Sequence, residues 1–206
     1  MLIADELAVL LTRERGGFRC SSYDVADTLA GGLLVELALE EQVSGEVDSA
    51  DFWKRRRVQQ ESGEPPSDPR LARTWELITT TAVGAVQRAV AKQAKDIVLP
   101  ALVQQEILSA TPRPLIGPRY TLLDESLRVN LTEELVPIVM TGAPADERQR
   151  NLVWLLNGAY SLRPALGIEL RHSVTVHQNL RALGKPTWPA KAAIDAMVGR
   201  RAAAAS

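Results

Sequence analysis

The sequence is poor in the side chains that most often carry out chemistry. Cys20 is the only cysteine among 206 residues, so the chain cannot form an internal disulfide, and a reducing compartment is expected. Its two histidines, His172 and His177, stand five positions apart, whereas zinc ligands on one helix favour a spacing of four with further cysteine or carboxylate ligands. We therefore predict no metal site and no catalytic cysteine.

The chain also lacks a long hydrophobic run. No stretch approaches the roughly 18 apolar residues that a transmembrane helix requires. The segment 1–17 carries Asp5 and Glu6 where a secretory signal would carry lysine or arginine. We therefore expect a cytoplasmic protein that contacts a membrane, if at all, only peripherally on its cytoplasmic face.

Positive charge is not in excess, and nucleotide-binding and hydrolase motifs are missing. The chain has 24 lysines and arginines against 25 acidic residues, for a net charge of −1 and a pI of about 6.2. A dedicated nucleic-acid-binding domain normally carries a clear positive excess, so nucleic acid is not the expected partner. The patterns G-x-x-x-x-G-K-[ST], G-x-G-x-x-G and G-x-S-x-G do not occur. We predict a protein that is not an enzyme and needs no cofactor.

What the sequence does contain is helical periodicity. Hydrophobic residues make up 46% of the chain and charged residues 24%, as in ordinary globular proteins. We predict a mainly α fold: one globular helical domain over residues 1–200 with a β-hairpin and short strands, followed by a frayed tail at 201–206. Segment 2–12 should be a helix with one apolar side, and the helix after Ser22 should use that residue as its N-cap. Gly31 and Gly32 in this second helix indicate close approach of another backbone.

Later segments add further helices and the strands. Asp68 should cap a helix that begins at Pro69, and residues 82–99 should form an amphipathic helix that kinks or restarts at Pro100. Short strands are predicted near 46–47 and 52–58. The hairpin should pair residues 114–116 with 119–123, with Gly117 near its tip. More helices follow from residue 125 to the C-terminus, including an apolar one around 153–156.

Two groups of basic residues are candidates for anion binding. Arg88, Lys92 and Lys95 stand at i, i+4 and i+7, so they share one face of the 82–99 helix. The run "DFWKRRRVQQ" places Trp53 before four cations, three of which are Arg55, Arg56 and Arg57. Both groups could be solvated surface, or could bind a lipid phosphate or nucleic acid. If 52–58 is a strand, alternation divides its cations between two faces and weakens the patch.

The order of segments resembles the Golgi phosphoprotein 3-like family, in a bacterial branch. The resemblance runs over nearly the whole chain, through "ELAVLLT", "LAGGLLVELALEEQV", "DPRLARTWELI", "LVQQEIL", "VWLLNGAYSL" and "GKPTWPAKAAIDAM". It implies a mostly helical domain that binds phosphatidylinositol 4-phosphate at a membrane surface, binds the cytosolic tails of glycosyltransferases, and can self-associate through a hairpin, here residues Pro114–Leu122.

The resemblance also implies a lipid pocket. Its tryptophan and arginine positions fall on Ser21 and Ala30, which lack that chemistry, and its two basic positions fall on Lys92 and Lys95, which match in charge. Arg88 lies one turn away, and Arg19 is near the missing pair in sequence. The leading hypothesis is a phosphoinositide- or anionic-lipid-binding adaptor.

Two other hypotheses remain open from the sequence. A winged-helix nucleic-acid binder would combine the "LVQQEIL" helix, the hairpin after it and the arginines near Trp53. A protein-interaction module would self-associate through the hairpin without binding lipid.

Overall fold

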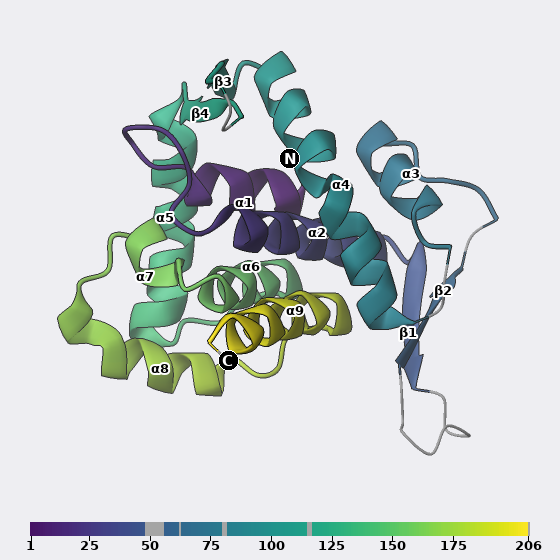
Figure 1. The fold of residues 1–206 in the computed structure, drawn as a ribbon. Coiled ribbons are helices and arrows are strands. Elements are labelled where there is room, and N and C mark those ends of the chain that lie inside the picture. The colour runs from purple at the N-terminus through teal and green to yellow at the C-terminus, as the bar shows by residue number, and fades with distance from the viewer. Residues whose placement is uncertain (48–55, 62, 80–81, 115–116, 206) are drawn as a thin grey trace.

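The computed structural model describes residues 1–47, 56–61, 63–79, 82–114 and 117–205. Within these ranges the chain forms nine α-helices, one short 3-10 helix and two antiparallel hairpins (Figure 1). The helices are α1 (Ile3–Leu11), α2 (Ser22–Leu39), α3 (Pro69–Glu76), α4 (Val83–Gln104), α5 (Glu125–Thr141), α6 (Glu147–Gly158), α7 (Leu162–Ala165), η1 (Leu170–His172), α8 (Ser173–Ala182) and α9 (Trp188–Ala204). The strands are β1 (Val43–Val47), β2 (Arg56–Gln60), β3 (Leu108–Thr111) and β4 (Arg119–Leu122). The predicted mainly α fold with a hairpin and short strands is confirmed.

Helix α2 is the centre of the fold. It packs against α1, α4, α6 and α9, and Figure 1 shows it passing behind α4. A Cβ atom on Gly32 would lie 2.9 Å from the backbone of Ala4, and one on Gly31 would lie 2.7 Å from the Cβ of Ala193. The predicted close approach is thus confirmed. The two glycines let α1 and α9 pack directly against α2, which offsets a helix-propensity cost of about 1 kcal/mol each.

The predicted apolar side of helix α1 is buried, and the rest of the helix is buried as well. All nine of its residues are buried, including Asp5 and Glu6. Arg70 donates to both carboxylate oxygens of Asp5, at 2.8 and 2.9 Å, and Arg148 donates to Glu6 at 2.9 Å. Because a buried carboxylate is costly unless it is paired, these two arginines are what allow an acidic helix into the core.

Helix α4 runs without a break through Pro100. Of the two alternatives predicted there, a new helix at Pro100 is wrong, since α4 continues to Gln104. Its apolar face is as predicted: Val86, Val90 and Ile97 are all buried. Pro100 is exposed, on the side of the helix where a lost backbone hydrogen bond is least costly.

The two hairpins differ from the predicted strand positions. In the first, Val43 pairs with Gln60 and Val47 with Arg56, so β2 begins at Arg56, and residues 52–55 lie outside the described part of the chain. In the second, the partner of Arg119–Leu122 is β3, Leu108–Thr111, and not the strand expected to begin at Pro114; residues 115–116 of that expected strand lie outside the described part of the chain. Pro112 and Pro114, which follow β3, have no N–H to donate to a ladder.

Helix ends follow the expected chemistry with one shift. Asp68 caps α3 as predicted, and its carboxylate accepts a hydrogen bond from the Arg70 backbone N–H at 2.8 Å. The cap of α2 is Ser21, not Ser22, because the Ser21 hydroxyl accepts from the Asp24 N–H at 3.1 Å. Helix α9 continues to Ala204, so the domain boundary expected at residue 200 falls inside it.

Candidate functional site

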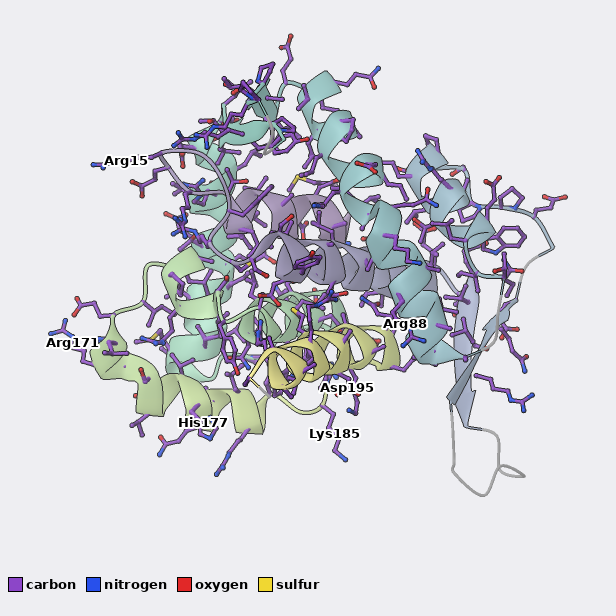
Figure 2. All side chains as sticks on the ribbon, in the orientation of Figure 1. Arg15, Arg88, Arg171, His177, Lys185 and Asp195 are labelled. Atoms are coloured by element: carbon purple, nitrogen blue, oxygen red, sulfur yellow. The ribbon has the colours of Figure 1, made fainter. Side chains whose placement is uncertain are left out.

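Helices α2, α4 and α9 enclose a groove of about 850 Å³. This size suits a small-molecule or headgroup site, which typically occupies about 300–1,000 Å³. Arg88 on α4 and Asp195 on α9 mark two of its walls in Figure 2. The lining residues are Ser22, Tyr23, Ala26 and Asp27 from α2; Val83, Gly84, Arg88, Ala91, Lys92 and Lys95 from α4; and Ala192, Asp195, Ala196, Gly199 and Arg200 from α9.

The α4 wall carries three cations. Arg88, Lys92 and Lys95 all line the groove, because their spacing places them on the helix face opposite the buried valines. Lys95 donates from Nζ to the Ser22 hydroxyl at 2.7 Å. Over the described residues, none of the three has an ion pair with a carboxylate. Their charge is therefore available to a ligand.

The α9 wall adds a fourth cation, Arg200, which the sequence reasoning missed. Arg200 forms an ion pair with Asp27 of α2, whose side chain is only 1% exposed. Burial raises the pKa of Asp27, and the neighbouring guanidinium of Arg200 opposes that rise. The second carboxylate oxygen of Asp27 accepts no hydrogen bond from any described residue. Arg200 thus has one buried partner and still reaches the groove.

In the sequence, the α9 wall could have been recognised by the spacing of its small residues. Ala192, Ala196 and Gly199 stand at i, i+4 and i+7, which places a narrow face toward α4. Asp195 on the same wall is paired with Lys191 at 2.7 Å, one turn earlier. The groove therefore has a cationic side on α4 and a side on α2 and α9 in which acidic residues are already paired.

The first residues of α2, Ser22 and Tyr23, line one part of the groove. Tyr23 is 66% exposed, and the guanidinium of Arg200 lies 5.1 Å from the centre of its ring. The partial positive charge of the α2 N-terminus adds to the local positive potential. An anion at this end of the groove would meet Lys95, Arg200 and the Ser22 hydroxyl.

Ser21 and Ala30, the positions that the resemblance assigns to tryptophan and arginine, do not supply that chemistry. Ser21 is used as the α2 cap, and Ala30 is fully buried. An aromatic ring and a guanidinium are nevertheless present beside the groove, in Tyr23 and Arg200.

Arg19 does not reach the groove. Its Nε donates to the carbonyl oxygen of Leu10 at 3.2 Å, which holds it against the end of α1. Burial and the nearby positive charge of Arg128 lower the pKa of Arg19. Arg19 therefore serves the packing of the segment before α2, and the idea that it replaces a missing pocket residue has no support from the geometry.

The basic run near Trp53 lies partly outside the described chain. Trp53 and Arg55 fall in residues 48–55, and of Arg56 only the backbone, at the start of β2, is described. Arg57 is exposed, and its backbone bridges to Ala82, the residue before α4. This strand therefore approaches the α4 end at which Val83 and Gly84 line the groove.

The β3–β4 hairpin lies at the other end of α4. Helix α4 has 22 residues, so its ends are about 33 Å apart at a rise of 1.5 Å per residue. Figure 1 shows β3 and β4 at the end of α4 away from β2. The structure therefore separates the β3–β4 hairpin from the strand that carries Arg57. The winged-helix hypothesis required the hairpin and these arginines to act together.

Cys20, the single cysteine, is partly buried. Burial raises the pKa of the Cys20 thiol to about 11, as in an inert packed cysteine. Over the described ranges there is no cluster of three or more histidine, cysteine or acidic side chains placed to hold a metal ion. The same part of the chain has no helix long and apolar enough to cross a membrane.

These features define a mainly helical protein with a basic groove between three helices. The family model described as Golgi phosphoprotein 3 (GPP34) matches residues 3–198, nearly the entire chain, so the protein belongs to this family. A comparison with curated proteins finds no match. The family resemblance read from the segment order is thereby confirmed.

Proposed function

We propose that the groove between α2, α4 and α9 binds the phosphate-bearing headgroup of an anionic lipid, such as a phosphoinositide. The protein would then act as a peripheral membrane adaptor, in keeping with its family. One observation carries the proposal: Arg88, Lys92 and Lys95 converge on one groove with no carboxylate partner among the described residues.

The groove chemistry suits a phosphate monoester. Lysine ammonium groups act as point charges toward phosphate oxygens, and an arginine guanidinium can donate two parallel hydrogen bonds. Ser22, which already accepts from Lys95, can donate its own hydroxyl proton to a phosphate oxygen. Arg200 adds a guanidinium whose pairing with Asp27 holds it beside the groove.

Vesicle co-sedimentation tests the proposal. Vesicles of phosphatidylcholine alone, with phosphatidylserine, and with phosphatidylinositol 4-phosphate are compared at low and high salt. We expect binding that requires anionic lipid and is strongest with the phosphoinositide. The Lys92→Glu/Lys95→Glu variant should bind about 30-fold more weakly or worse, because each basic residue near an anionic surface contributes about 1 kcal/mol.

A matched control removes the effect of net charge. The Arg181→Glu/Lys185→Glu variant changes the charge by the same amount at two exposed positions that do not line the groove. It should keep most of the binding. If both double variants lose binding equally, only the overall charge matters and a specific groove is refuted. If the unaltered protein ignores anionic vesicles at low salt, lipid binding itself is refuted.

A further inference from the structure

Two tyrosines are exposed at the end of the molecule where α2 begins and α9 ends. Tyr23 is 66% exposed and Tyr160, just after α6, is 75% exposed. Consecutive arginines of α9 hold them: Arg200 lies 5.1 Å from the centre of the Tyr23 ring, and Arg201 lies 4.0 Å from that of Tyr160. We call these four residues the tyrosine edge.

The edge is fixed to the fold from both sides of α9. Arg201 donates to the carbonyl oxygen of Gly158 at 2.8 Å and lies 3.0 Å from a carboxylate oxygen of Asp24, the neighbour of Tyr23. Both rings are therefore attached to the same few residues at the end of α9. The exposed ring of Tyr160 is therefore held in place by its contact with Arg201.

Tyr160 occupies a backbone position that usually favours glycine. Its φ is +54°, and its N–H donates to the carbonyl oxygen of Asn157 at 3.0 Å, in the turn that ends α6. The other non-glycine residues with positive φ in the described chain are Glu41 and Glu106, whose charged side chains water solvates well. In the turn after α6, the same strained backbone position instead exposes an aromatic ring. An exposed ring held in this way is a candidate contact for a binding partner.

The chemistry of the edge matches the boundary between lipid headgroups and acyl chains. Tyrosine carries an apolar ring and a polar hydroxyl, so it is favoured at that depth. Arg200, which is 42% exposed, can reach a lipid phosphate while its apolar stem remains against the ring of Tyr23, whereas the guanidinium of Arg201 is held by Gly158 and Asp24. The edge is continuous with the basic groove, because Tyr23 and Arg200 belong to both.

We propose that the tyrosine edge contacts an anionic bilayer directly, with Tyr160 inserted at the headgroup level while the groove holds a headgroup. The occupant is a lipid surface because Lys95 and Arg200 of the groove and Arg201 of the edge all lie beside the first residues of α2, next to two exposed aromatic rings. This inference rests on the proposed function, and it adds the orientation of the protein: α9 lies with its C-terminal end toward the membrane.

Site-specific labelling tests the insertion. In a Cys20→Ser background, the variants Tyr160→Cys and Glu133→Cys each give one thiol for an environment-sensitive nitrobenzoxadiazole label. Glu133 is exposed on α5, outside the groove and the edge, and is the matched control. With phosphatidylserine and phosphatidylinositol 4-phosphate vesicles, emission of the label should rise at Tyr160→Cys and be quenched by nitroxide-bearing lipid, with no change at Glu133→Cys.

A second readout separates the edge from the groove. Tyr160→Ala should weaken vesicle binding about fivefold, since roughly 40 Å² of apolar ring surface no longer enters lipid. Its affinity for soluble inositol 1,4-bisphosphate should stay unchanged, because Tyr160 does not line the groove.

The outcomes distinguish the two proposals. If the soluble headgroup and the vesicles both bind but the label at Tyr160→Cys stays in water, the edge proposal is overturned and the groove proposal stands. A label signal that follows protein concentration without vesicles would mean that a second copy covers the edge, which also overturns it. If neither the headgroup nor the vesicles bind, both proposals fail.

Discussion

Arg148 of α6 donates to a carboxylate oxygen of Glu36 in α2 at 2.9 Å. The other Glu36 oxygen accepts the backbone N–H of Ile3 at 2.6 Å, and Arg148 also donates to the Met1 carbonyl oxygen at 2.7 Å. One ion pair thus joins α1, α2 and α6. Glu36 lies in "LAGGLLVELALEEQV", one of the segments that carry the family resemblance, and its role here is to hold the N-terminus in the core.

We predict that Arg148→Met destabilises the protein by about 3 kcal/mol. Two acidic side chains, Glu6 and Glu36, would lose their cation while only 12% and 11% exposed, and breaking a buried pair on one side is costly. Urea unfolding measures the change. Arg171→Met is the control, because its ion pair with Glu169 is mostly exposed and should matter by less than about 1 kcal/mol. Equal effects of the two changes would contradict this account.

Gly32→Ala should destabilise the protein by about 1–3 kcal/mol. The new methyl group would lie 2.9 Å from the Ala4 backbone, which overpacks the contact of α1 with α2. The same substitution at Gly199 of α9 meets no atom within 4 Å, so Gly199→Ala should stabilise by up to about 1 kcal/mol through helix propensity. Thermal unfolding of both variants checks the opposite signs. A neutral Gly32→Ala would show that α1 shifts away at little cost.

The pH dependence of stability should reveal Asp27. Burial raises its pKa in the folded state, so its contribution to stability is complete below the unfolded pKa and is lost as pH rises through the folded pKa. Asparagine does not titrate. The free energy of unfolding of Asp27→Asn, relative to that of the unaltered protein, should therefore increase over the pH interval that begins near the ordinary aspartate pKa and extends upward through the folded pKa. A decrease over that interval would mean that the ion pair with Arg200 outweighs burial.

Self-association through residues Pro114–Leu122 stays a prediction. Residues 115–116 lie outside the described chain, and Tyr120 on β4 already packs its ring against Phe18, with 5.9 Å between ring centres. Sedimentation velocity over a range of concentrations tests it. Arg119→Pro interrupts β4. If the unaltered protein sediments with the mass of two chains and this variant with the mass of one, the hairpin is supported as the interface. A monomer at every concentration would contradict self-association through the hairpin.

The fold was readable from the sequence where local chemistry determines it. Periodicity located the helices, Asp68 and Pro69 marked the start of α3, and the glycine pair in α2 indicated close packing. Local rules failed where distant residues decide. The burial of α1 depends on Arg70 and Arg148, which lie far along the chain and carry no local sign of that role.

The candidate groove was half visible in the sequence. The spacing of Arg88, Lys92 and Lys95 on one helix predicted a shared face, and the structure brings all three to one groove. Arg200 and Tyr23 could not be added, because their place depends on how α9 crosses α2. Residue 200 was also taken as the end of the domain, where the structure has a helix that continues to Ala204.

Helix α2 supplies both the floor of the groove and the middle of the core. Tyr23 and Asp27 face the groove, while Gly31 and Gly32, about one turn beyond Asp27, receive α9 and α1. A molecule that bridges α2, α4 and α9 therefore binds only when the core is assembled, and it raises the melting temperature by an amount that grows with the logarithm of its concentration relative to its Kd. Thermal shift can consequently rank candidate headgroups without any assay of biological activity.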